Sequence, residues 1–342
     1  MLGKRIAIVL GANSITVFSH GKGIVFSESS TVISDRYSGR TLVMGGSAKS
    51  MSERLPASMQ AVTPIRNGIV NDYDAAVVMI RKYINKLCAG RLLKPNGLLS
   101  VPSTVTSVQQ KTIFDIVSSA GAARACFVDE ALAAAIGAGV SLTQPMGTFI
   151  CDIGGETTDC AVVTMGNIAV SRAVNVGGND LDRTISDYIY REHNIQIGSE
   201  TADMIKRTVG TAVFRNEEVA VIAGGKNCDT GLPVHFEITS TEVYWVLKSF
   251  LEEILDCIKR VLQNTPPELV SDIAETGIIL SGGTANLYGI DRFIEWNTHI
   301  HTHVAENPEH CAALGLGKLL NNIDYLEANG YVFVSAEEPE DD

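Results

Sequence analysis

The chain has 342 residues, of which 45% are hydrophobic and 6% aromatic, and its formal net charge is −12. A chain of this length is usually divided between two domains, each with its own core. The acidic balance argues against nucleic-acid binding, and the absence of an apolar run of about 18 residues argues against a membrane-spanning helix.

The cysteines and the N-terminus favour a cytoplasmic protein. Seven cysteines are scattered along the chain and never form a CxxC pair, so they predict neither a disulfide framework nor a zinc site. The N-terminal sequence MLGKRIAIVLG enters a strand-like run without a signal-peptide pattern. We therefore expect a cytoplasmic protein.

One structural plan occurs twice in the chain. Residues 6–26, IAIVLGANSITVFSHGKGIVF, predict three strands joined by glycine-containing turns, and residues 149–170, FICDIGGETTDCAVVTMGNIAV, repeat this pattern. Backbone N–H groups and hydroxyls in such a turn can replace water around an anion, so the first turn of each copy is a candidate phosphate site. The duplication predicts an α/β fold with two similar halves.

A helix is predicted after each copy, because apolar residues recur there at helical spacing. The first helix begins near Asp74 and ends before a loop, CAGRLLKPNGLL; the second is longer and is stopped by Pro266 and Pro267. The apolar stripe of the first comprises Tyr73, Val77, Ile80, Ile84 and Leu87, and that of the second Val243, Leu247, Phe250, Ile254, Ile258 and Val261.

Several segments resemble the actin, sugar-kinase and heat-shock chaperone ATPase superfamily, and within it the MreB family of bacterial actin homologues. They include SVPSTVTSVQQKTI, DEALAAAIGAG, DIGGETTDCAVV and NVGGNDLD, and the likeness runs in order from residue 10 to residue 290. The resemblance implies an actin-like α/β fold, in which two similar domains, each with a smaller inserted subdomain, surround a central nucleotide cleft. It implies that residues 1–144 with a C-terminal helix at 318–330 form domain I, 145–317 form domain II, and 331–342 form an acidic tail.

The resemblance also implies a site for ATP or ADP and Mg²⁺. Asp152 matches the aspartate that holds magnesium through its water shell, which suits a hard cation that keeps several waters; a turn-capping role is the alternative. Glu130 matches the glutamate that positions the attacking water, where a carboxylate can orient water and accept its proton. A glutamate favoured by a helix dipole is the alternative at that position.

Further residues match nucleotide-facing positions of the family. Asp203 and Lys206 match an acidic-x-x-Lys pair that contacts ribose and adenine, although one helical turn between them also permits an ordinary ion pair. Thr157 and Thr158 offer hydroxyls to the β- or γ-phosphate. The remaining positions are Gly11, Ala12, Asn13 and Ser14 in the first turn, Gly154, Gly155 and Glu156 in the second, Gly177 and Gly178, and Gly282, Gly283 and Thr284 on the adenosine side.

Four positions depart from the family pattern. Val9 stands where an aspartate is expected, Ala12 where a threonine is expected, and Thr284 where glycine is usual. Glu156 replaces a glycine whose N–H faces the γ-phosphate, and a like-charge contact at about 4 Å costs roughly 4 kcal/mol at an effective dielectric constant of about 20. Glu156 would avoid that cost by turning outward, or by reaching magnesium in place of the carboxylate that Val9 lacks. We expect at most a slow ATPase coupled to polymerisation.

Leu92 and Leu93 resemble the membrane-inserting loop of MreB proteins. They lie between Arg91 and Lys94, so two leucines would enter the acyl boundary while the cations meet anionic lipid. Packing of both leucines onto domain I is the alternative. The resemblance thus implies a peripherally membrane-associated protein.

The family implies a cytoskeletal protein that self-associates into filaments and maintains cell shape by organising wall synthesis. Its expected partners are other MreB paralogues and cell-envelope membrane proteins, and a head-to-tail contact that does not close generates filaments. The four departures favour an alternative, a nucleotide-independent paralogue that caps or copolymerises with an active MreB. A small-molecule kinase of the superfamily is disfavoured, because the chain offers neither the aspartate base nor the sugar pocket.

Overall fold

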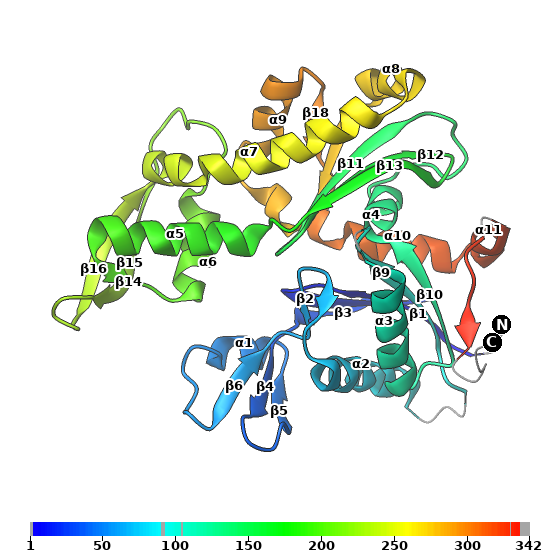
Figure 1. Ribbon diagram of the computed structural model, residues 1–342, viewed down its shortest axis with the longest axis horizontal. Helices are drawn as coiled ribbons and strands as arrows, with labels where there is room; N and C mark the ends of the chain where they lie inside the picture. Colours follow the sequence, from blue (N-terminus) through cyan, green and yellow to red (C-terminus); the bar gives the residue numbers. More distant parts are fainter. Residues whose placement is uncertain (1–2, 90–92, 104, 329, 336–342) are drawn as a thin grey trace. The chain divides into compact units, whose positions relative to one another are not determined.

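The computed structural model describes residues 3–89, 93–103, 105–328 and 330–335 of the chain. The chain divides into two compact units. Unit 1 comprises residues 1–145, 163–168 and 310–342, and unit 2 comprises residues 146–162 and 169–309. Figure 1 labels the helices and strands of both units.

Unit 1 is built on a six-stranded sheet in the order β19-β10-β9-β1-β2-β3. β1, β9 and β10 run parallel, whereas β2 pairs antiparallel with both β1 and β3. This arrangement confirms the first of the two predicted meanders. The strands are β1 (Arg5–Leu10), β2 (Ser14–Ser19), β3 (Gly23–Ser29), β9 (Asn96–Val101), β10 (Arg124–Asp129) and β19 (Val334–Ser335).

Helices cover both faces of this sheet (Figure 1). On one face Ile6 and Ile8 share a core with Ile80 and Tyr83 of α2 and with Ile116 of α3. On the other face α10 packs so closely that Gly317 lies against the ring of Phe18. The helices are α2 (Tyr73–Cys88), α3 (Ser107–Ser119), α4 (Glu130–Gly137), α10 (Cys311–Leu320) and α11 (Ile323–Ala328).

A smaller sheet is inserted into unit 1 after β3. Its order is β5-β4-β6, and a two-stranded hairpin of β7 and β8 follows it. These elements are β4 (Val32–Asp35), β5 (Thr41–Met44), α1 (Gly46–Met51), β6 (Met59–Val62), β7 (Ile65–Arg66) and β8 (Ile69–Val70).

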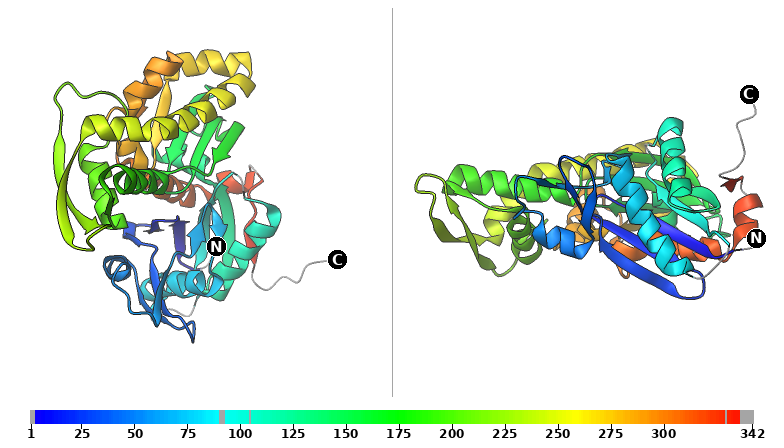
Figure 2. Two further views of the ribbon diagram at one scale, coloured as in Figure 1. Left: turned by 60° about the vertical axis from the view of Figure 1, so that its left-hand side comes forward. Right: turned by 90° about the horizontal axis from the view of Figure 1, so that it is seen from below.

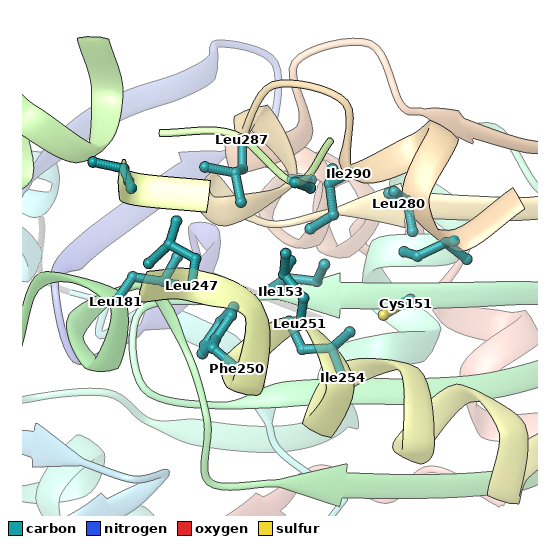
Figure 3. Packing of buried hydrophobic residues seen from close by; sticks show 14 of the residues in the cluster. Cys151, Ile153, Leu181, Leu247, Phe250, Leu251, Ile254, Leu280, Leu287 and Ile290 are labelled. Atoms are coloured by element: carbon teal, nitrogen blue, oxygen red, sulfur yellow. The ribbon is translucent and has the colours of Figure 1, made fainter. Parts of the chain in front are cut away.

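Unit 2 is built on a five-stranded sheet in the order β13-β12-β11-β17-β18, which contains the second predicted meander. Figure 3 shows that β11 residues Cys151 and Ile153 pack with Leu181 of α5 and with residues of α7. The predicted apolar stripe of α7 is confirmed, since its six residues are all buried. The sheet and its covering helices are β11 (Thr148–Ile153), β12 (Thr158–Thr164), β13 (Asn167–Val174), β17 (Ile278–Ser281), β18 (Thr302–Val304), α5 (Gly178–His193), α7 (Ser240–Asn264), α8 (Pro267–Thr276) and α9 (Ile290–Thr298).

A second, three-stranded sheet in the order β14-β15-β16 belongs to unit 2. β15 and β16 form a long antiparallel hairpin, which Figure 2 shows from two sides. This part contains β14 (Ile195–Gln196), α6 (Ser199–Val209), β15 (Ala220–Asn227) and β16 (Pro233–Thr239). The chain also forms two 3-10 helices, η1 (Gly283–Asn286) and η2 (Pro308–His310), and η2 directly precedes α10.

The C-terminal segment corrects two predictions. Instead of one helix over residues 318–330, α10 ends at Leu320 and α11 spans Ile323–Ala328. The first residues of the tail predicted from residue 331 are ordered into the fold, because Phe333 is 5% exposed and β19 pairs antiparallel with β10. The acidic residues 336–342 lie outside the described part of the chain.

Candidate functional site

Asp152 lies at the end of β11, where the parallel register pairs it with Ser281 of β17. The carboxylate is 8% exposed, and its Oδ1 accepts a hydrogen bond from Ser281 Oγ at 2.6 Å. Burial raises the pKa of Asp152 to about 7, although the Ser281 hydrogen bond opposes this shift and the charge of Asp159 adds to it. A nearby cation favours the ionised carboxylate. This buried single carboxylate fits a magnesium ion that keeps most of its waters.

The turn after Asp152 is closed by its own backbone. Gly154 N–H donates to the carbonyl of Thr157 at 2.8 Å, and in unit 1 Gly11 N–H donates to the carbonyl of Ser14 at 2.9 Å. The sequence duplication therefore extends to the hydrogen bond that closes each turn. In the first turn the backbone also accepts from Ser30, whose Oγ lies 2.5 Å from the carbonyl oxygen of Ala12, while Asn13 is exposed.

The N-terminus of α5 packs directly on the second turn. The N–H of Gly178 donates to the carbonyl of Gly154 at 3.0 Å, and the N–H of Asn179 donates to the carbonyl of Gly155 at 2.7 Å. A Cβ on Gly177 would lie 2.5 Å from the backbone nitrogen of Glu156. Glycine at position 177 is therefore needed for the close approach of two backbones, whereas a Cβ on Gly178 would meet the side chain of Thr284.

The adenosine-side loop predicted at residues 282–284 contacts the same turn. Gly282 has a φ of +85°, and a Cβ there would lie 2.3 Å from the carbonyl oxygen of Ile153. Thr284 Oγ1 donates to the carbonyl of Gly154 at 2.8 Å. Gly283, at the start of η1, has open space where a Cβ would stand. Unit 2 thus brings three predicted segments together: 152–157, 177–178 and 282–284.

Lys206 of α6 is held by three acceptors. Its Nζ lies 3.0 Å from the carbonyl oxygen of Gly178, 2.8 Å from Asp182 Oδ1 and 3.1 Å from Asp203 Oδ1. The Asp203–Lys206 ion pair exists, and Lys206 is too buried for an ordinary surface pair, since its side chain is 13% exposed. Lys206 therefore connects α6 to the first turn of α5.

The two aspartates around Lys206 titrate in opposite directions. Burial raises the pKa of Asp182 even though the charge of Lys206 lowers it. For Asp203 burial also raises the pKa, but the charge of Lys206 and the hydrogen bond from Arg207 outweigh it and leave the pKa lowered. Asp182 was not predicted from the sequence, where its only signal is its position one turn after Gly178.

Two predicted phosphate-facing side chains have protein partners. Thr158 is fully buried, and its Oγ1 donates to the carbonyl of Val176 at 2.8 Å. This corrects the prediction for Thr158, because the side chain alternates to the core side of β12, which leaves Thr157 as the half-buried hydroxyl of the turn. Glu156 is half-buried, and its Oε1 accepts from Asn179 Nδ2 at 3.5 Å, so it lies beside the first turn of α5.

Glu130 belongs to unit 1. It is the first residue of α4, and the preceding Asp129 caps the helix by accepting from Ala131 N–H at 2.9 Å. This position at a helix N-terminus suits both interpretations of Glu130, the water-positioning carboxylate and the dipole-stabilised one.

The predicted membrane loop is only partly described. Leu92 lies outside the described residues, and Leu93 is 54% exposed. Within the described ranges of the chain, no helix is long and apolar enough to cross a membrane, and no cluster of three or more His, Cys, Asp or Glu side chains could hold a metal ion.

Comparison with known proteins adds sequence and structural relatives. The family model for MreB/Mbl protein matches residues 3–328. The chain is 38% identical over 330 residues to the cell shape-determining protein Mbl of Bacillus subtilis (strain 168), covering 95% of this chain and 98% of that protein. It is 34% identical over 330 residues to the cell shape-determining protein MreB of Escherichia coli (strain K12), covering 95% of each.

Solved structures give the same relationship. MreB5 of Spiroplasma citri, crystallised with ADP, matches with a TM-score of 0.92 at 31% identity, covering 96% of this chain and 99% of that one. The same protein crystallised with AMPPNP matches with a TM-score of 0.91, at the same identity and coverage.

Proposed function

The chain belongs to the MreB/Mbl family of cell shape-determining proteins and has an actin-like fold, and on this premise we propose that it forms cytoskeletal filaments. These filaments lie in the cytoplasm against the membrane and maintain cell shape by organising wall synthesis. We propose that residues 1–144 with the C-terminal segment 318–330 form domain I and that residues 145–317 form domain II. Cell-envelope membrane proteins and other MreB paralogues are the proposed partners.

The same proposal includes a nucleotide site for ATP or ADP with Mg²⁺. The relative crystallised with ADP and with AMPPNP supports nucleotide binding at 31% identity. In this chain Asp152 would hold the magnesium, and the 154–157 turn with Gly177 and Gly178 would face the phosphates. Magnesium, when bound, neutralises phosphate charge. The residues 282–284, Asp203 and Lys206 would lie on the adenosine side, and Glu130 would orient water.

We further propose that this chain hydrolyses ATP weakly or not at all. Glu156 is the residue that supports this proposal. The turn keeps its closing hydrogen bond and its packing on α5, but it presents a carboxylate beside α5 where the family has glycine. A carboxylate near a terminal phosphate repels it. Val9 and Ala12 remove a further carboxylate and a hydroxyl from the first turn.

An assay of phosphate release during assembly tests the proposal. The purified protein is incubated with Mg-ATP while released phosphate and pelleted polymer are measured together. Polymer without stoichiometric phosphate release is the expected result, and one phosphate released per assembled subunit would refute weak hydrolysis. Failure to pellet under any nucleotide condition would refute independent filament formation.

A nucleotide-independent paralogue is the second candidate, because all four departures lie in the segments assigned to the nucleotide. Such a protein would cap or copolymerise with an active MreB. It would pellet only when an active family member is present, and its pelleting would be the same with and without ATP.

A further inference from the structure

Thr284 connects the three segments of unit 2 that meet at the second turn. The side chain is buried, with 9% exposure, and its Oγ1 donates to the carbonyl of Gly154 at 2.8 Å. The same carbonyl accepts the N–H of Gly178 at 3.0 Å. A Cβ on Gly178 would lie 2.6 Å from Thr284 Oγ1, so the hydroxyl fills the space that this glycine leaves.

These bonds fix the direction of two consecutive peptide groups. The carbonyl of Gly154 points to Thr284 and Gly178, and the carbonyl of Gly155 accepts from the N–H of Asn179 at 2.7 Å. In a planar trans peptide the C=O and the following N–H point in opposite directions. The N–H groups of Gly155 and Glu156 therefore point away from the groups that donate to these two carbonyls. Paired backbone N–H donors of this kind can bind an anion.

We propose that Thr284 is a positioning residue that sets the Gly154–Gly155 peptide plane, so that the N–H of Gly155 is already oriented toward a nucleotide phosphate. This inference rests on the proposed nucleotide-binding function. Orientation before binding lowers the ordering cost that the ligand must otherwise offset. The contribution matters in this chain because Glu156 adds a repelling charge to the same turn and Ala12 lacks a hydroxyl in the other.

Four variants of the full-length protein test this role. Thr284→Val keeps the shape and removes the hydroxyl, Thr284→Ala removes it with less bulk, and Thr284→Ser retains it. Thr265→Val is the matched control, because Thr265 is 7% exposed and its Oγ1 donates to the carbonyl of Val261 at 2.7 Å, at the end of α7.

Amide hydrogen exchange and calorimetric binding of Mg-ADP are measured on each variant. Loss of one hydrogen bond corresponds to roughly a fivefold to tenfold change in an equilibrium constant. Thr284→Val and Thr284→Ala should therefore exchange the Gly178 and Asn179 amides about fivefold to tenfold faster than wild type and bind Mg-ADP about fivefold to tenfold more weakly. Thr284→Ser and Thr265→Val should stay within about twofold of wild type in both measurements.

Three results would overturn the inference. The first is unchanged exchange in both variants that lack the hydroxyl, and the second is faster exchange without any change in Mg-ADP affinity. The third is a defect in Thr284→Ser equal to that in Thr284→Val. If wild type binds no Mg-ADP, the nucleotide part of the proposed function fails, and the exchange rates alone then decide whether Thr284 fixes the turn.

Discussion

Lys206 shows how one side chain can connect two helices of unit 2. An ammonium group has three N–H donors, and Gly178, Asp182 and Asp203 each supply an acceptor to it within 3.1 Å. Removing such a partner leaves partly buried carboxylates uncompensated, which costs more than the pair itself contributes. Lys206 is therefore a structural connection between α6 and α5 as well as a candidate ligand residue.

Lys206→Met should lower the free energy of unfolding by roughly 2 to 4 kcal/mol at pH 8. The pKa of Asp182 is already raised by burial, and it should rise further because the charge and hydrogen bond of Lys206 lower it. A carboxyl group whose pKa is raised by folding destabilises the fold when it is ionised and not when it is protonated, so the penalty should shrink as the pH falls toward 4. Urea unfolding at both pH values measures this.

Lys248→Met is the control for that prediction. Lys248 is 53% exposed and its pair with Glu252 is 3.9 Å long, so its loss should change stability by less than about 0.5 kcal/mol. A Lys206→Met penalty that is independent of pH would contradict the role assigned to Asp182.

Unit 2 brings together three segments that the sequence assigns to the nucleotide, but the hydrogen-bond partners of these segments could not be predicted. Gly177 and Gly282 were named from the family resemblance, and the close approach of backbone atoms to each of them gives the physical reason for glycine there. Ser281 and Asp182 could not be named, since their roles depend on the register between β11 and β17 and on the packing of α6 against α5. Thr158 was misassigned because a turn sequence does not reveal which of two hydroxyls faces the core.

At the scale of elements, α4 and α10 cross with their backbones in direct contact. A Cβ on Gly315 would lie 1.8 Å from the carbonyl oxygen of Ala133, and a Cβ on Gly137 would lie 1.8 Å from the carbonyl oxygen of Cys311. No side-chain rearrangement can relieve a clash with backbone atoms, so the helices would have to separate.

Gly315→Ala should therefore destabilise unit 1 by about 3 kcal/mol or more, measured by thermal unfolding. Gly46→Ala is the matched control, because Gly46 also lies in a helix and a Cβ there would meet no atom within 4 Å. That variant should be neutral or slightly more stable. Equal stability of the two variants would show that the α4–α10 crossing is not tight.

Elements with strong periodicity were predictable, and those without it were not. The stripe of α7 follows from apolar spacing, and the two meanders follow from a repeated pattern of apolar strands and glycine-containing turns. Tyr73 was predicted to belong to the apolar stripe of α2, but it is the first residue of that helix and is 40% exposed. β19 has two residues and pairs with β10, which lies about 200 residues earlier in the chain. A local sequence pattern cannot predict a pairing over that separation.

At the scale of the whole molecule, the proposed membrane association depends on the loop that contains Leu93. Its 54% exposure in unit 1 is consistent with an apolar side chain available to lipid. A single leucine binds a bilayer weakly, but a filament carries many copies and multiplies the attachment.

Leu93→Glu should lower co-sedimentation of assembled protein with anionic vesicles at least tenfold, since avidity amplifies each lost contact. Leu42→Glu is the control, because Leu42 is also an exposed leucine of unit 1, at 43%. It should leave vesicle binding unchanged. Equal losses in both variants would indicate a general charge effect and remove the loop from the membrane interface.

We propose that Glu156 weakens ATP binding at a turn that otherwise keeps its closing hydrogen bond and its packing on α5. The most direct measurement is calorimetric binding of Mg-ATP and Mg-ADP to wild type, Glu156→Gly and Glu156→Gln. We expect both variants to bind Mg-ATP at least tenfold more tightly than wild type while Mg-ADP binding changes little, because the repelled charge lies on the terminal phosphate. Wild-type affinity for Mg-ATP that equals that of both variants would contradict it.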